Sequence, residues 1–385
     1  MSEYQYYEFQ ALDRPLTQEQ ISELRACSSR AQITPRSFVN VYNWGDFKGD
    51  PRQWMERYFD AFLYFANWGS RRLMLRLPKK LLDPEAVAPY CAAQNFSCRQ
   101  KEDHIVLSFE SELEDYEWDE GKSWLASLVP LRSDLMRGDH RAMYLGWLLA
   151  VQFQEITDDA PEPPVPPGLG ELNAALDCLA DFLGIDADLI AAAAERSPEQ
   201  QVSTPSRKEI GEWVRTFPSA EKDAIVVRLI DGDDPHLSAE VRQRATFEIS
   251  GGRSDERLGR TAGEILARAE IITAERKKEQ AEQRAREKAR RERAEAEERK
   301  KRLESLAGKE NELWATVDRL IATKQPRRYD EAVSLLQDLH DLAKLQGKGS
   351  DFKFRMGALK RENSAKSALM ERLRKTKLLD DSRVP

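Results

Sequence analysis

Acidic side chains crowd the stretch ESELEDYEWDE, which holds seven Asp and Glu residues between Glu110 and Glu120. Carboxylate oxygens bind Mg²⁺, so this stretch is one candidate for the site of a metal-dependent nuclease, with Lys101 or Lys122 stabilising the charge. A metal site, however, needs a few acids held in a buried frame, and a run of adjacent acids on a loop is usually solvated. We therefore predict no metal and no cofactor, and keep the nuclease as an alternative.

Cysteine and histidine residues are few and scattered. The four cysteines form no C-x-x-C pair, and the four histidines show no ligand spacing, so a zinc cage is not expected. The motifs G-x-x-x-x-G-K-[ST], G-x-G-x-x-G, G-x-S-x-G and H-E-x-x-H do not occur. Because these motifs build the sites for phosphate binding, dinucleotide binding, serine hydrolysis and zinc proteolysis, their joint absence favours a non-enzymatic protein.

The triplet Asn-Trp-Gly occurs twice, at 43–45 and at 67–69. Asn and Gly suffice to form a turn, so the two indole rings need another explanation. They either pack into a small core that closes one end of a sheet, which is slightly favoured, or form an exposed partner-binding site. We expect both turns at the same end of the sheet. The candidate partner-binding residues are Asn43, Trp44, Asn67, Trp68, Arg71 and Arg72.

The charge is divided unevenly along the chain. Residues 1–254 hold 27 Lys and Arg against 42 Asp and Glu, a net of −15, whereas residues 255–385 hold 33 against 25, a net of +8. Nucleic-acid binding needs basic side chains gathered on one face, because several phosphates must be neutralised together. The C-terminal helices are the better candidate for such a basic surface. Its candidate residues are Arg327, Arg328, Lys353, Lys360 and Arg361.

The elements that must position these residues begin with an N-terminal α+β domain at 1–157. The stretches YQYYEFQAL and ITPRSFVNVY are extended in pattern, and DAFLYFANWGSRRLMLRLP and FSCRQKEDHIVLSFESE are typical of hairpins. Helices begin at Thr17, with a capping box, and at Asp50-Pro51. This order predicts a mainly antiparallel sheet, with a helical lobe from Gly121 onward.

The rest of the chain is predicted to be helical and divided into several domains. A proline-rich stretch at 158–170 holds five prolines and is expected to be a stiff, extended linker. A helical domain at 171–252, a long charged helix at 253–308 and a C-terminal helical domain at 309–385 follow. The sequence therefore predicts a multidomain chain in which all-α domains are joined by a charged helix.

The charged helix holds 13 basic and nine acidic residues in 275–304, with Leu303 as its single large apolar residue. Glu-to-Lys and Glu-to-Arg pairs at i,i+4 support a long solvated helix of about 1.5 Å per residue. Without an apolar a/d seam, a coiled-coil dimer is the weaker interpretation. We expect a monomeric strut.

One C-terminal segment resembles known proteins. YDEAVSLLQDLHDLA, with the trailing KSALMERL, is similar to a segment of uncharacterised bacterial proteins, some of which also carry a SWIM zinc finger. The resemblance covers about 60 residues, and the finger's own cysteine and histidine pattern is absent from this chain. It transfers no catalytic residue and implies a bacterial interaction domain.

These patterns together favour a non-enzymatic interaction or scaffold protein of a bacterial multi-protein system, with a protein partner. The alternatives are a nucleic-acid-associated factor that uses the basic C-terminal half, in defence or genome maintenance, and the metal-dependent nuclease. No apolar run approaches the ~18 residues of a membrane helix, and the N-terminus is polar, so we expect a cytoplasmic location.

Overall fold

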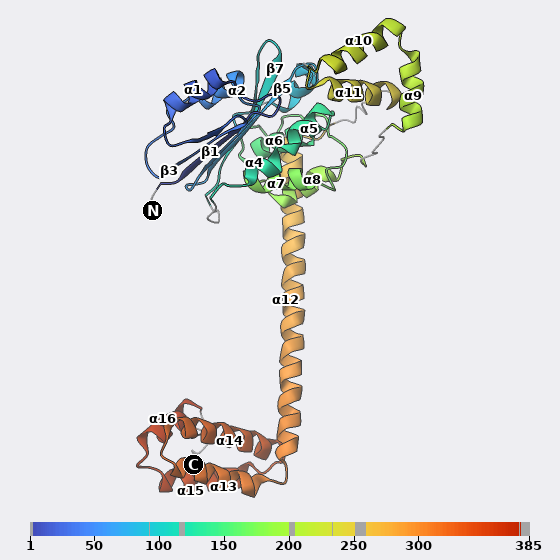
Figure 1. Ribbon diagram of the computed structural model, residues 1–385. Coiled ribbons are helices and arrows are strands. Elements are labelled where there is room, and N and C mark those ends of the chain that lie inside the picture. Colours follow the sequence, from blue (N-terminus) through green and yellow to red (C-terminus); the bar gives the residue numbers. More distant parts are fainter. Residues whose placement is uncertain are drawn as a thin grey trace. The chain divides into compact units, whose positions relative to one another are not determined.

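The computed structural model divides the chain into two compact units, Met1–Arg276 and Lys277–Pro385 (Figure 1). The residues that it describes are 3–91, 93–114, 120–199, 205–232, 234–250, 259–376 and 378. The first unit contains an antiparallel sheet and helices, whereas the described part of the second unit is helical. The predicted class, an α+β domain followed by helical regions, is confirmed.

The described part of the first unit forms one antiparallel sheet of seven strands, in the order β2-β3-β1-β4-β5-β7-β6. The expected hairpins are present, because β4 pairs with β5 and β6 pairs with β7. The strands are β1 (Gln5–Gln10), β2 (Gln32–Thr34), β3 (Ser37–Tyr42), β4 (Ala61–Ala66), β5 (Ser70–Pro78), β6 (Phe96–Gln100) and β7 (His104–Glu112).

Strand β1 lies between β3 and β4 and fixes the position of both Asn-Trp-Gly turns. Gln5, the first residue of β1, is opposite Tyr42 of β3 on one side and Ala66 of β4 on the other. Each turn begins directly after one of these two residues. The register therefore places both turns at the same end of the sheet, as predicted.

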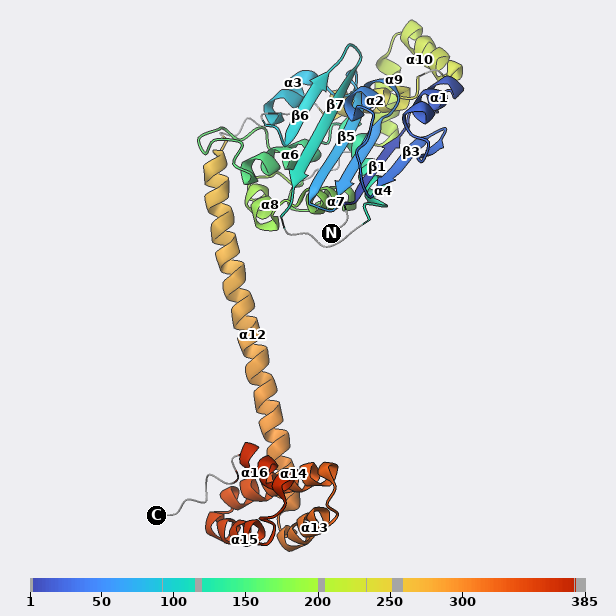
Figure 2. The same ribbon diagram turned by 90° about the vertical axis from the view of Figure 1, so that its left-hand side faces the viewer.

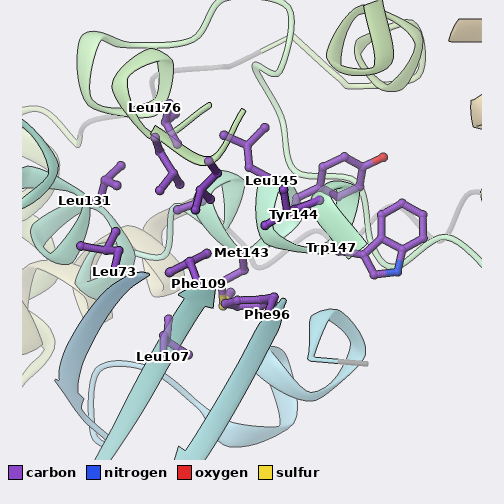
Figure 3. Packing of buried hydrophobic residues seen from close by; sticks show 14 of the residues in the cluster. Leu73, Phe96, Leu107, Phe109, Leu131, Met143, Tyr144, Leu145, Trp147 and Leu176 are labelled. Carbon is purple, nitrogen blue, oxygen red and sulfur yellow. The ribbon is translucent and has the colours of Figure 1, made fainter. Parts of the chain in front are cut away.

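One face of the sheet is covered by the helical lobe. Leu107 and Phe109 lie on the strands below Met143, which points from its helix toward the sheet, as Figure 3 shows. Because strand side chains alternate between faces, this apolar layer uses every second residue of β4, β5 and β7. The covering segments are α3 (Pro84–Val87), η1 (Ala88–Tyr90), α4 (Trp124–Leu128), α5 (Pro130–Met136), α6 (Arg141–Gln152), α7 (Ala174–Leu183) and α8 (Ala187–Ala194).

The opposite face is covered only in part, by α1 (Gln18–Cys27) and α2 (Pro51–Arg57) (Figure 2). Both predicted helix starts are confirmed: Thr17 forms a capping box with Gln20, and Asp50 caps α2 with Pro51 in its first turn. A second apolar cluster gathers Phe9 and Phe38 of the sheet with Trp54 and Met55 of α2. On this face of the sheet, α1 and α2 leave much of β5 and β7 uncovered.

The proline-rich stretch 158–170 does not separate two units, because it packs against the first unit. Glu162 and Leu169 are buried, and Pro161 bridges to Thr261. Arg260 donates hydrogen bonds to the Glu162 carboxylate at 2.8 and 3.1 Å. The physical reason for the difference from the predicted linker is this buried ion pair, whose two residues lie almost 100 positions apart.

A small helical module follows in the same unit, with α9 (Arg207–Thr216), α10 (Ser219–Asp231) and α11 (Leu237–Ser250). Polar contacts dock it against the sheet domain. Lys80 Nζ lies 2.7 Å from Asp234 Oδ2, and His236 Nε2 lies 2.9 Å from Asp13 Oδ2. The expected helices are present, but they belong to the first unit.

The charged segment forms one helix, α12 (Ala262–Leu306), of 45 residues. Ala262 and Ile265 at its start are buried in the core of the first unit, and Leu303 near its end is buried as well. Every residue from Ala274 to Arg302 is exposed. The predicted i,i+4 pair of Glu297 and Lys301 is present at 3.2 Å, whereas Arg291 pairs with Glu295 and not with Glu287.

The second unit has a core of its own. Val317, Leu336 and Leu359 are among the buried side chains that its helices contribute. The predicted apolar stripe of Tyr329, Val333, Leu336, Leu339 and Leu342 is buried. The helices are α13 (Glu310–Ala322), α14 (Pro326–Leu345), α15 (Gly349–Glu362) and α16 (Ser367–Lys375).

The glycines of the two Asn-Trp-Gly turns provide a matched test of this fold. Gly69 has a φ of +99°, and a Cβ there would lie 1.9 Å from the Leu113 carbonyl oxygen, whereas Gly45, at +78°, has open space around it. We expect Gly69→Ala to lower the free energy of unfolding by about 3 to 5 kcal/mol, through backbone strain and a steric clash. Gly45→Ala should cost only the strain, about 1 kcal/mol. Urea denaturation measures both, and equal losses would contradict this strand register.

Candidate binding surfaces

Both indole rings of the Asn-Trp-Gly turns are solvent-exposed. Trp44 is 70% exposed and Trp68 is 47% exposed. The favoured prediction of a small closing core is therefore wrong. The physical reason is that hydrogen bonds from Gln5, Tyr4 and Leu113 hold the two turns, so neither turn needs a packed ring.

Backbone and polar contacts hold the first turn without the tryptophan. Gln5 Nε2 donates a hydrogen bond of 3.1 Å to the Gly45 carbonyl, and Asn43 is exposed. The Arg30 guanidinium carbon lies 5.4 Å from the centre of the Trp44 ring, which is a cation–π distance. Arg30 therefore supports the exposed ring from one side.

Asn67 and Gly69 hold the second turn in the same way. Asn67 Oδ1 accepts a hydrogen bond of 2.9 Å from Tyr4 N, and Asn67 N donates one of 3.0 Å to the Tyr4 carbonyl. The Gly69 carbonyl accepts from Leu113 N at 3.1 Å. These contacts form the turn, and Trp68 remains exposed beside them. We call Trp44 and Trp68 with their turns the tryptophan end.

Arg71 is not a surface contact, which corrects the prediction made for it. Its side chain is buried and donates hydrogen bonds to the carbonyls of Asp181 and Phe182, at 3.2 and 2.8 Å. Its guanidinium lies over the rings of Phe65, Trp124 and Phe182. Arg71 therefore fastens β5 to the end of α7.

Arg72 points to the other face of the sheet and is half-buried. It forms an ion pair with Glu110, the residue opposite it on β7. Ser108 Oγ donates a hydrogen bond of 3.0 Å to the same carboxylate. Arg72 is thus the member of the predicted Arg pair that reaches a surface open to ligands.

This open face carries two hollows, of about 440 and 340 Å³. The larger lies beside α2, with Arg52 and Glu56 on that side and Met74 and Ser108 on the sheet. The smaller lies over Tyr64 and Arg72, toward the tryptophan end. Glu110 and Gln94 line both hollows, so the two form one continuous region that we call the open sheet face.

The phenol groups on the open sheet face act as hydrogen-bond donors. Tyr7 and Tyr64 both lie near Gln5 Oε1, at 2.8 and 3.3 Å. Burial raises the pKa of Tyr64 to about 12 and that of Tyr7 above its ordinary value. Both phenols therefore keep their protons at neutral pH. They suit ligand binding better than general-base catalysis.

A thiol pair lies beside the edge strand β6, where Cys91 and Cys98 pack against the core under the helical lobe. The hydrogen bond from Cys91 lowers the pKa of Cys98 to about 7, and the same bond, with burial, raises that of Cys91. Cys98 lines the larger hollow. Its partner is another thiol, whereas cysteine hydrolases pair the nucleophile with a histidine. The pair does not provide the acid–base chemistry of a hydrolase.

The acidic stretch is described only in part, because 115–119 lie outside the described residues. Glu110 is ion-paired with Arg72, and Glu120 pairs with Lys122. In the part of the chain that the structure covers, no three His, Cys, Asp or Glu side chains are arranged to hold a metal ion. In the same part, no helix is both long enough and apolar enough to cross a bilayer.

The sequence interpretation missed an exposed apolar surface on α10. This helix buries none of its residues, although four large aliphatic side chains lie on one side of it. Their spacing has the period of a core-facing helix, so only the exposed fraction shows that the face is open. The residues, with their exposure, are Val226 (50%), Val227 (54%), Leu229 (66%) and Ile230 (77%).

The predicted basic residues of the second unit lie on two helices. Arg327 and Arg328 are exposed at the start of α14, where Arg328 forms an ion pair of 2.7 Å with Glu331. Lys353, Lys360 and Arg361 lie on α15. The three α15 residues, at i, i+7 and i+8, share one side of that helix.

Comparisons with protein-family models, curated proteins and solved structures give no significant match for this chain. The chemistry of these surfaces is therefore the basis for a functional assignment.

Arg71 and Arg72 differ in burial, and this difference can be measured. We expect Arg71→Ala to lower the free energy of unfolding by about 2 to 4 kcal/mol, because buried carbonyl groups lose a charged donor. Arg72→Ala removes a partly exposed ion pair and should cost less than about 1 kcal/mol. Chemical denaturation of the two variants checks the assignment, which would be contradicted if Arg72→Ala were the more damaging change.

Proposed function

We propose that this chain is a non-enzymatic interaction protein whose N-terminal unit binds a protein partner at the tryptophan end. The observation that carries the proposal is the exposure of Trp44 and Trp68 in two turns that other groups hold in place. These two indole rings leave apolar surface in contact with water, although the fold does not require them. A partner that covers the rings would remove this surface from water. Tryptophan is also the residue type most enriched among the side chains that dominate binding energy at protein interfaces.

The surroundings of the tryptophan end suit a partner with both apolar and polar groups. The smaller hollow of the open sheet face begins at Ser70, next to the second turn, and its floor holds Arg72 and Tyr64. Charged and hydroxyl groups at the margin of an aromatic patch give specificity and orientation to a complex. A partner that covers both indoles would reach these groups.

The apolar side of α10 favours the same class of function. Four neighbouring large aliphatic side chains on one exposed helix are uncommon on a protein that binds nothing. Two separate apolar surfaces on one unit fit a scaffold better than a single-ligand receptor. The C-terminal resemblance to a bacterial interaction domain agrees with this proposal, and the setting that we propose is a bacterial multi-protein assembly in the cytoplasm.

The proposal predicts that the indole rings contribute to binding and not to folding. Trp44→Ala combined with Trp68→Ala should leave the melting temperature within about 3 °C of the wild type, because neither ring is buried. Quantitative affinity capture from the native host, followed by titration with the purified partner, should show at least a tenfold loss of affinity.

Phe153→Ala is the matched control, since Phe153 is an exposed ring in the same unit that belongs to neither turn. It should leave capture unchanged. Two results would contradict the proposal: capture of the same partner with unchanged affinity by the double variant, or a loss of several kcal/mol of stability in it.

A further inference from the structure

Helix α15 (Gly349–Glu362) has two sides of different chemistry. Phe352, Met356 and Leu359 are buried in the core of the second unit. The residues at i, i+1, i+4, i+7 and i+8 share a second side of the helix, because each turn holds 3.6 residues; three of them are exposed and the other two, Gly357 and Lys360, are half-buried. We call this set the α15 stripe; it consists of Lys353, Phe354, Gly357, Lys360 and Arg361.

An exposed aromatic ring lies on the α15 stripe. Phe354 is 77% exposed, whereas Phe352, two residues earlier, is 6% exposed. Phe352 is therefore the phenylalanine that α15 contributes to the core of the unit, and Phe354 is not part of that core. A second ring held in water has a flat apolar face available to a ligand.

The basic side chains of the stripe are available as well. Among the described residues, no carboxylate forms an ion pair with Lys353, Lys360 or Arg361. By contrast, Arg372 of α16 pairs with Asp330. A basic side chain that forms no ion pair can bind an external anion without first losing an internal partner.

Positive charge is concentrated around this helix. Residues 344–376 hold ten Lys and Arg against three Asp and Glu, a net of +7. Residues 309–343 of the same unit hold five against seven, a net of −2. The α15 stripe thus lies within the positively charged part of a unit whose other half is slightly acidic, which favours a polyanionic ligand.

Gly357 lies in the middle of the stripe without a packing reason. A Cβ at this position would meet nothing within 4 Å. Glycine inside a helix costs about 1 kcal/mol relative to alanine, so a glycine with free space around it needs another explanation. The missing side chain leaves the helix backbone open to close approach from solvent, between Phe354 and Arg361.

We infer that the α15 stripe binds a single-stranded nucleic acid. Lys353, Lys360 and Arg361 would contact phosphates, and the Phe354 ring would stack on a base. Gly357 would let the strand lie close to the helix. Proteins that bind single strands combine cations for the phosphates with an exposed aromatic ring for a base. The ring cannot stack on a base in a duplex in the same way, because those bases are already stacked on each other. An acidic peptide would use the cations but has no planar base for the ring.

The test uses the full-length protein and one matched pair of variants. Gly357→Glu places a carboxylate in the centre of the stripe, where there is space for it. Gly211→Glu makes the same change in α9, at a helical glycine that also has nothing within 4 Å. Glutamate favours helix more than glycine does, so neither variant should melt below the wild type.

Binding is measured by fluorescence anisotropy with a labelled DNA strand of mixed sequence, about 20 nucleotides long, at low salt, about 50 mM. We expect Gly357→Glu to weaken binding at least tenfold and Gly211→Glu to change it less than twofold. Three phosphate contacts predict that log K falls with log salt with a slope of about −2. Phe354→Ala should weaken binding of the single strand at least fivefold and binding of the duplex much less.

Several results would overturn the inference. These are no binding by the wild-type protein at low salt, equal effects of the two glycine variants, or the same loss from Phe354→Ala on duplex and single strand. Tighter binding of a labelled polyglutamate peptide, unaffected by Phe354→Ala, would assign the surface to an acidic protein instead.

Discussion

The buried ion pair between Glu162 and Arg260 is the contact on which the organisation of the first unit depends. Tyr144 donates a hydrogen bond to the same carboxylate, and Arg260 also donates to the carbonyls of Ala192 and Ala193. A buried charge without its partner costs several kcal/mol, so these groups hold one another in place. The pair fastens the proline-rich stretch to the residues just before α12. As a consequence, the first turns of that helix belong to the core of the first unit.

The two faces of the sheet in the first unit have different roles, one in stability and the other in binding. The face under the helical lobe is filled by apolar side chains of β4, β5 and β7, and Arg71 fastens it to α7. The opposite face keeps polar groups such as Arg72, Glu110 and Tyr64 in contact with solvent. Because alternate residues of one strand point to opposite faces, Arg71 and Arg72 have different roles although they are neighbours in the sequence.

Exposed side chains that the fold does not need are found in both units, and they differ in chemistry. The first unit exposes indole and aliphatic groups at the tryptophan end and on α10, which suit a protein surface. The second unit exposes cations with one phenylalanine on α15, which suit a polyanion. The exposed turns of α12 lie between these surfaces in the sequence. Acidic and basic residues alternate there, so most of their electrostatic field cancels. The proposed ligands match this division: a protein partner for the first unit and a single-stranded nucleic acid for the second.

Local patterns in the sequence determined most of the secondary structure. The capping box at Thr17, the Asp50-Pro51 helix start, the two hairpins and the charged helix depend on residues within one turn or one hairpin of each other. The position of both Asn-Trp-Gly turns at one sheet end also followed from the order of short elements. The apolar stripe of α14 was also predicted to be buried, and it is. Tertiary structure decided the burial of side chains elsewhere, because that burial depends on residues far away in the chain. Arg71 is covered by α7 more than 100 residues later, and 158–170 is held by Arg260. The aliphatic side of α10 has the period of a buried helix, but none of the described elements buries it.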